Sequence, residues 1–262
     1  MNLLSSTSVF GFYTLLSRIL GYLRDILIAV FLGTSVFADA FFVAFRLPNT
    51  FRRLFAEGTF NAAFIPSYAA EKIKGEEKGR KFADEVFNLL LYVLIILIII
   101  VEILTPFVVY LIAPGFYENS EKFNLAVEFT RITFPFLLFV SLSSFLSGIL
   151  NSNNKFAAAA AAPIILNIIL IMSLLFSFYF ELNIAQSLSI AVTLAGILQF
   201  LLLIFFTKNF YFPSLKLFFK FGKSLKNFFR KLLPSIFSSG ITQINILIGT
   251  IIASFQSGAV SY

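Results

Sequence analysis

The 262-residue chain contains no cysteine and no histidine. Disulfide bonds, thiolate nucleophiles, Cys/His metal sites and imidazole acid–base catalysis are therefore not available to it. Charged residues are also scarce, at 13% of the sequence, compared with about a quarter in soluble domains. These absences exclude much enzyme chemistry and argue against an ordinary soluble protein.

Apolar residues make up 59% of the chain, phenylalanine alone occurs 37 times, and the mean hydropathy is +0.92. A membrane-spanning helix needs about 20 apolar residues, so the chain has room for about seven. Predominantly apolar stretches lie at 6–33, 36–68, 84–113, 125–150, 157–180, 185–207 and 232–256. The sequence therefore predicts an all-α, polytopic transmembrane helix bundle. The first stretch is too long for a signal peptide and lacks a cleavage site, so we expect it to remain in the mature protein.

Lysine and arginine gather in two segments between predicted helices, with five in Lys72–Lys81 and seven in Lys208–Lys231. The segment Pro114–Asn124 has one, and Glu181–Asn183 has none. Because basic loops stay in the cytoplasm, we expect a multi-pass protein of the bacterial inner membrane with a cytoplasmic N-terminus. Topology accounts for the net charge of +7, so nucleic acid is not an expected partner.

Within residues 208–231, basic side chains recur every three or four positions opposite leucine and phenylalanine. This pattern predicts an amphipathic helix on anionic headgroups, with specific partner binding as the alternative. We therefore divide the chain into a lobe of six transmembrane helices at 1–207, an interfacial connector at 208–231, and one further span within 232–262. The sequence stops soon after that span, and we expect it to be truncated.

Charged side chains inside predicted helices are concentrated in the first two, where each costs a few kcal/mol unless it is paired or faces water. Helical spacing places Arg18, Gly21 and Asp25 on one face of the first helix, with Ser17 and Arg24 on the adjoining edge. The polar residues of the second helix form a facing stripe, so the two helices can border one polar cavity. That stripe comprises Asp39, Arg46, Asn49, Arg53 and Glu57, with Arg52 beside it.

We expect Pro48 and Gly58 to interrupt the second helix and to free backbone groups at membrane depth. Five arginines accompany three carboxylates in this hairpin, which leaves an excess of positive charge. Planar guanidinium groups suit bidentate phosphate binding, so the hairpin predicts an anionic phosphate ligand. The alternative is internal ion pairs together with side chains that reach the interface, and it is strongest for Arg46, Arg52 and Arg53.

Several stretches of the sequence resemble the MurJ (MviN) family of lipid II flippases. They are Ser17-Arg18-Ile19-Leu20-Gly21 with Arg24-Asp25, the run 38–49 (ADAFFVAFRLPN), the run 52–58 (RRLFAEG) and Phe64-Ile65-Pro66. The runs 113–116 (APGF), 132–135 (ITFP) and 148–151 (GILN) continue the match along nearly the whole chain. The resemblance implies a transporter of the multidrug/oligosaccharidyl-lipid/polysaccharide (MOP) superfamily with fourteen helices in two lobes, about seven of which are present here.

The resemblance implies that lipid II moves from the cytoplasmic to the periplasmic leaflet during peptidoglycan synthesis, without an enzymatic reaction. It implies that Arg18, Arg24 and Arg52 bind the diphosphate in a central cavity. Asp25, Asp39, Asn49 and Glu57 are implied in binding or gating. From their helical positions we add Ser17 and Gly21 to the binding residues, and Arg46 and Arg53 to the charge network.

No metal or cofactor is expected, and membrane potential or a coupling cation would supply the energy. Lipid II, membrane lipids and proteins of cell-wall synthesis are the expected partners. The second lobe, which in the family holds a further cavity arginine and the lipid-tail groove, is absent from these residues.

Three other functions stay open. The first is another MOP exporter, for a different lipid-linked glycan or a drug, although a cation-drug exporter would have an acidic cavity. The second is a membrane enzyme acting on polyprenyl diphosphates, which would be expected to show clustered aspartates for magnesium or a histidine acid. The third is a noncatalytic scaffold, which has little reason to keep so many charges within two helices.

Overall fold

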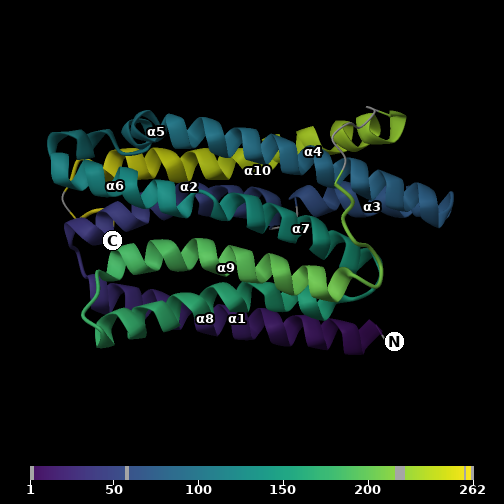
Figure 1. Cartoon of the computed structure of the whole chain (residues 1–262), viewed down its shortest axis with the longest axis horizontal. Coiled ribbons are helices and arrows are strands. Elements are labelled where there is room, and N and C mark those ends of the chain that lie inside the picture. Colours follow the sequence, from purple (N-terminus) through teal and green to yellow (C-terminus); the bar gives the residue numbers. More distant parts are fainter. Residues whose placement is uncertain (1–2, 57–58, 216–221, 257, 261–262) are drawn as a thin grey trace.

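The computed structural model of the chain describes residues 3–56, 59–215, 222–256 and 258–260. Most of these residues are helical and none of them is in a strand, which confirms the predicted all-α class. The long helices run roughly along one axis (Figure 1). In chain order the helices are α1 (Leu3–Leu32), α2 (Val36–Ala56), α3 (Thr59–Ile73), α4 (Glu76–Ile103), α5 (Thr105–Ile112), the short 3-10 helix η1 (Pro114–Glu118), α6 (Ser120–Thr133), α7 (Phe136–Ser152), α8 (Phe156–Tyr179), α9 (Ile184–Thr207) and α10 (Lys223–Ala253).

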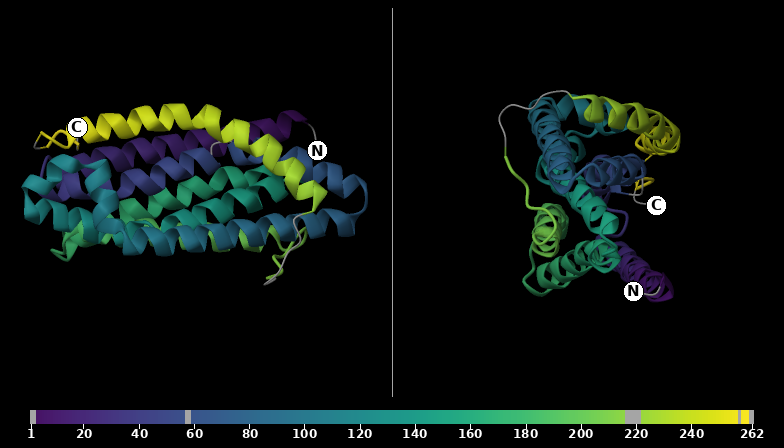
Figure 2. Two further views of the ribbon diagram at one scale, coloured as in Figure 1. Left: turned by 90° about the horizontal axis from the view of Figure 1, so that it is seen from above. Right: turned by 90° about the vertical axis from the view of Figure 1, so that its right-hand side faces the viewer.

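Helix α7 lies at the centre of the bundle and packs on α9, α3 and α2. On one side of it, α1 packs on α8 and α8 packs on α9; on the other, α2 packs on α6 and α3 packs on α4 and α10. The end view in Figure 2 shows these two groups diverging from α7. Consecutive helices α1 and α2 therefore belong to different groups.

Prolines divide two of the predicted spans. The stretch 84–113 consists of α4 and α5, which break at Leu104 just before Pro106. Pro106 has no backbone N–H to bond the carbonyl four residues earlier, and the Thr105 hydroxyl donates to that Glu102 carbonyl instead (3.0 Å). The stretch 125–150 likewise consists of α6 and α7, with Pro135 between them. The prediction of single helices was wrong at both places.

The predicted interruption at Pro48 was also wrong, because α2 continues through this residue to Ala56. Pro48 cannot bond the Ala44 carbonyl, but the Thr133 hydroxyl of α6 donates to that oxygen (3.0 Å). A neighbouring helix thus satisfies the group that the proline leaves open. Gly58 lies outside the described residues, and the predicted span 36–68 consists of α2 and α3.

By length and composition, four stretches of the described residues can cross a membrane: Glu76–Ile103, Ser120–Ser152, Phe156–Tyr179 and Ile184–Thr207. Large apolar side chains on their outer faces are exposed, for example Ile96 and Phe178. Such a surface is stable against lipid rather than water, so the chain is a multi-pass membrane protein. The total of seven spans stays a prediction.

The segment after α9 is fastened to α4 rather than lying as a free helix. Residues 209–215 are not helical. The Tyr211 hydroxyl donates to buried Asp84 (2.9 Å), and the Asn88 amide donates to the Ser214 carbonyl (2.8 Å). Burial, with Asp84 beside it, raises the pKa of Tyr211. Helix α10 starts at Lys223 and continues past residue 231 without a break. The predicted boundary between the connector and the last span therefore lies inside a helix. The division into domains stays a prediction.

Candidate functional site

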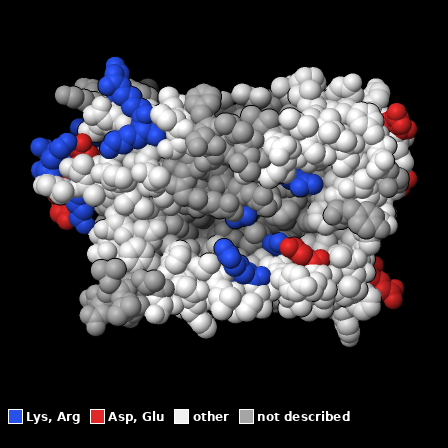
Figure 3. Space-filling view, turned by 180° about the vertical axis from the view of Figure 1, so that it is seen from behind, with Lys and Arg blue, Asp and Glu red and all other residues white. Residues whose placement is uncertain are grey.

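A cavity of about 670 Å³ lies between the two groups of helices. Its walls come from α1, α2, α3, α7, α8 and α9, so residues far apart in sequence meet there. Figure 3 shows the hollowed face of the molecule, with basic side chains in the hollow, away from both ends. Its polar lining consists of Thr14, Ser17, Arg18, Arg52, Asn61, Ser143, Ser144, Ser147, Asn151 and Gln199.

Arg18 places a positive charge in this cavity. It stands near the middle of the 30-residue helix α1, about 20 Å from either end at 1.5 Å per residue. The hydrocarbon layer is about 30 Å thick, so we expect a mid-helix guanidinium to lie inside it. In the part of the chain that the structure describes, Arg18 has no hydrogen-bond or ion-pair partner. Its charge is available to a ligand.

Arg52 lines the same cavity from α2. Its Nε donates to Asn49 Oδ1, one helical turn earlier (2.9 Å). This bond orients the guanidinium group. The structure thus brings Ser17, Arg18 and Arg52 together, with Asn49 holding one of the arginines.

Arg24 has a different environment and lies outside the described lining of this cavity. Its Nε and Nη2 donate to Asp25 Oδ1 (3.0 and 2.7 Å), and its Nη1 donates to Asn167 Oδ1 (2.9 Å). The amide of Asn167 donates in turn to the Ser17 carbonyl (2.9 Å). A side chain at Gly21 would meet Asn167 at ordinary contact distance, 3.6 Å. This network joins α1 to α8.

Asp39 forms a buried ion pair with Lys122 of α6, which also lies over the ring of Phe116. The backbone N–H of Gly258 donates to the same carboxylate (2.9 Å). Asp39 therefore fastens the start of α2 to α6 and to the segment after α10, and it lies outside the described cavity lining. Its role in gating stays a prediction.

The remaining residues of the predicted charge network are less informative. Arg46 is half-buried on α2. The side chain of Arg53 and the whole of Glu57 lie outside the described residues. Within the ranges that the structure describes, no three carboxylates come close enough to hold a metal ion.

Several functional candidates escaped the sequence analysis. Asn167, Gln199 and Ser143 are polar residues within strongly apolar helices, and a polar side chain in such a helix is the signal that could have identified them. The alanine run 157–162 was given no role, yet Ala159, Ala160 and Ala162 line the cavity, where their small side chains leave room.

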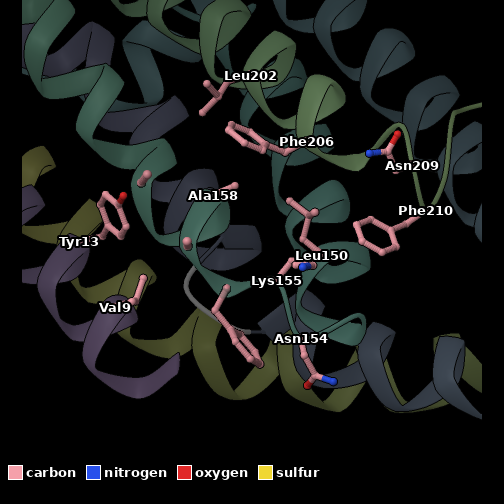
Figure 4. Close-up of a pocket in the computed structure, with 13 residues that line it drawn as sticks. Val9, Tyr13, Leu150, Asn154, Lys155, Ala158, Leu202, Phe206, Asn209 and Phe210 are labelled. Carbon is pink, nitrogen blue, oxygen red and sulfur yellow. The ribbon is translucent and has the colours of Figure 1, made fainter. Parts of the chain in front are cut away.

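Other residues of the same alanine run border a second pocket of about 660 Å³ between α1, α8 and α9. Figure 4 shows that Val9, Tyr13, Leu202 and Phe206 give it apolar walls, with Lys155 and two asparagines at its other side. It contains none of the predicted site residues, so the arginine-lined cavity is the candidate site.

Comparisons with known proteins identify the family and support the fold. The family model "Lipid II flippase MurJ" matches residues 28–262. A protein of Rhizobium tropici described as "Probable lipid II flippase MurJ" is 41% identical over 100% of this chain and 50% of its own length. The solved structure "Lipid II flippase MurJ, inward closed conformation" superposes with a TM-score of 0.82 at 29% identity, covering 97% of this chain and 52% of that one.

A structure described as an inward-facing multidrug resistance MATE family transporter of the MOP superfamily superposes with a TM-score of 0.69 at 17% identity, over 92% of this chain and 55% of that one. At that identity it shows the fold alone. The chain spans about half the length of the curated relatives it matches. From the matched residues and the shared fold, the chain belongs to the MurJ family of lipid II flippases.

Proposed function

We propose that this chain supplies the arginine-lined part of a flippase that moves lipid II from the cytoplasmic to the periplasmic leaflet of the bacterial inner membrane. The name carried by its relatives supports the flippase activity. The observation that carries the substrate assignment is the presence of Arg18 and Arg52 in one cavity. An anionic headgroup would offset the cost of holding these charges there.

Mechanistically, the diphosphate enters the cavity from the cytoplasmic side and accepts hydrogen bonds from both guanidinium groups. Planar, forked donors match phosphate oxygens better than the ammonium group of lysine does. The polyprenyl tail stays in the lipid, so only the headgroup needs shielding. Rocking of this lobe against a second one then exposes the headgroup on the other side.

The membrane potential or a coupling cation supplies the energy of the cycle. About 2.3 kcal/mol per charge is available for each 100 mV, which is enough to bias an anionic substrate. The sign of the cavity separates this function from its closest rival, a cation-drug exporter, because both charged groups in the described lining are basic. The basic lining also gives no support to an enzyme acting on polyprenyl diphosphates, because such an enzyme would need carboxylates that bind magnesium.

Binding measurements on the purified protein in nanodiscs test the proposal. Arg18→Ala and Arg52→Ala should each weaken lipid II binding by about tenfold or more, because each removes a charge-assisted bond. Arg52→Lys should recover only part of the loss, since lysine cannot form the planar fork.

Arg80→Ala is the matched control, because Arg80 is an exposed arginine of α4 outside the described cavity lining. The Arg80→Ala variant should bind lipid II with the same affinity as the wild-type protein. Unchanged lipid II affinity in both cavity variants would remove the assignment of these arginines to the headgroup.

A further inference from the structure

A second set of polar side chains lines the arginine cavity, and none of them is charged. Asn61 comes from α3, Ser143 and Asn151 from α7, and Gln199 from α9. They share the cavity with Arg18 and Arg52, but none of them was among the site residues predicted from the sequence. Together they give one cavity both a cationic and a neutral polar part.

The hydrogen-bonding capacity of this set is unused. Ser143 and Gln199 are each only 4% exposed, yet neither has a hydrogen-bond partner among the described residues. The Asn61 and Asn151 Oδ1 atoms are likewise buried and without a partner there. On these three helices, Ser67, Ser152 and Ser189 each donate to a carbonyl of the preceding turn, whereas Ser143 does not.

Unsatisfied buried polar atoms destabilise a fold, and they persist where a ligand or water completes their bonds. Packing fixes at least one of them. A Cβ on Gly148 of α7 would lie 2.5 Å from Asn61 Oδ1, so the absence of that Cβ lets the carboxamide rest directly against α7. Asn61 is thus held at the cavity wall, with its oxygen left without a protein partner.

Amides and hydroxyls donate and accept hydrogen bonds without adding charge, which suits sugar hydroxyls and acetamido groups. We propose that Asn61, Ser143, Asn151 and Gln199 form a neutral subsite for the sugar next to the diphosphate. The inference rests on the proposed function, in which the diphosphate lies at Arg18 and Arg52. The neutral subsite distinguishes a glycosylated lipid from its bare diphosphate.

Two probes test the subsite on the protein in nanodiscs: lipid II, and undecaprenyl diphosphate, which has no sugar. The variants are Ser143→Ala and Gln199→Met, singly and combined. Each lost hydrogen bond should weaken lipid II binding about threefold to tenfold, and the double variant about tenfold or more. Binding of undecaprenyl diphosphate should stay within about twofold of the wild-type value.

Ser141→Ala is the matched control. Ser141 is on the same helix, is 1% exposed and also has an unbonded hydroxyl, but it lies outside the described cavity lining. Removing either unbonded hydroxyl should leave the melting temperature unchanged or slightly raised, so misfolding will not obscure the result. Asn151→Leu provides an independent test of the same subsite on the same two probes.

The outcomes separate the two proposals. Equal losses for both probes, or no loss for lipid II in the double variant and Asn151→Leu, would overturn the neutral subsite while leaving the arginine assignment intact. Failure of the wild-type protein to bind either probe would overturn the proposed function, and with it the subsite. A loss confined to lipid II supports the subsite.

Discussion

Three arginines of one hairpin have three different surroundings. Arg18 faces the cavity without a described partner, Arg52 is oriented by Asn49, and Arg24 is bonded by Asp25 and Asn167. A guanidinium group that lines the cavity can contact a ligand there, whereas Arg24 lies outside the described lining and must first exchange its two protein partners. We therefore expect direct contact with the substrate at Arg18 and Arg52.

The buried pair of Asp39 and Lys122 should be important for stability. Asp39→Ala leaves an unpaired ammonium group in the interior, which costs about 3–5 kcal/mol. The expected result is a marked decrease in the melting temperature of the purified protein. The double variant Asp39→Ala/Lys122→Met removes both charges and should recover part of that loss, because no unpaired charge remains. Equal melting temperatures for the wild-type protein and Asp39→Ala would contradict a stabilising pair.

Glu71 gives a pH dependence outside the membrane-spanning segments. It accepts hydrogen bonds from Lys74 (2.6 Å) and Ser224 (2.8 Å), and the Lys74 bond in particular lowers its pKa. A carboxylate with a lowered pKa stabilises the folded state above its unfolded pKa, and this stabilisation disappears as the pH falls through the folded value.

We expect the melting temperature of the wild-type protein to fall more steeply between about pH 5 and pH 3 than that of Glu71→Gln, which cannot titrate. The effect should be small, because Lys74 is half-exposed and water screens the pair. Parallel pH profiles for the two proteins would show that the contact between α3 and α10 does not depend on this charge.

At the scale of helices, two prolines each leave the carbonyl four residues earlier without its usual N–H donor, and a threonine hydroxyl bonds that carbonyl instead. Pro48 lies inside α2, and Thr133 of α6 bonds the carbonyl that it leaves open; Pro106 separates α4 from α5, and Thr105 bonds its open carbonyl. A proline alone does not determine whether a helix continues, because α2 continues through Pro48 whereas α4 ends just before Pro106. The presence of Pro48 therefore led to the wrong prediction that α2 is interrupted there.

The close approach of α3 to α7 depends on Gly148. A Cβ at this position would lie 2.5 Å from Asn61 Oδ1 and 2.7 Å from Phe64 Cδ1. Gly148→Ala should therefore destabilise the protein by about 1–3 kcal/mol, as overpacking does, and should also displace Asn61 from the cavity wall. Thermal unfolding and lipid II binding measure the two effects.

Gly249→Ala is the control for this substitution, because nothing lies within 4 Å of a Cβ at that position of α10. It should leave the stability unchanged or raise it by up to about 1 kcal/mol, since alanine favours a helix. Similar melting temperatures for the two alanine variants would contradict tight packing at Gly148.

The two ends of the whole molecule differ in charge. On the face drawn in Figure 3, lysine and arginine gather at one end together with a few acidic side chains, and the charged side chains at the other end are acidic. Because basic ends remain in the cytoplasm, we expect the turn between α3 and α4 inside the cell and the segment between α5 and α6 outside. The absence of native cysteine allows this to be measured without background labelling.

Lys78→Cys and Glu118→Cys place single thiols at exposed positions of these two segments. The outer membrane is first removed, so that a membrane-impermeant maleimide can reach an inner membrane that is still intact. The reagent should then label Glu118→Cys only. Lysed cells should give labelling of both variants. The opposite pattern would reverse the proposed orientation.

The sequence predicted the helical class and placed the candidate site on the first two predicted helices. The cavity contains Ser17, Arg18 and Arg52 from that prediction. The sequence did not predict that α1 and α2 would diverge to opposite groups of helices, or that Asp39 would pair with a lysine 83 positions away. Helical periodicity shows which residues of one helix share a face, but it contains no information on which other helix covers that face.

The sequence by itself determined the membrane environment and the helices, because apolar length and scarce charge leave a chain few other stable states in lipid. It also predicted arginines at membrane depth. Only the tertiary structure decided which of them remain open to a ligand and which polar side chains of α3, α7 and α9 join them. The physical reason is that hydrogen bonds between distant helices depend on how those helices pack. The sequence shows that Asn167 is polar, but it does not show whether an arginine of another helix reaches its carboxamide.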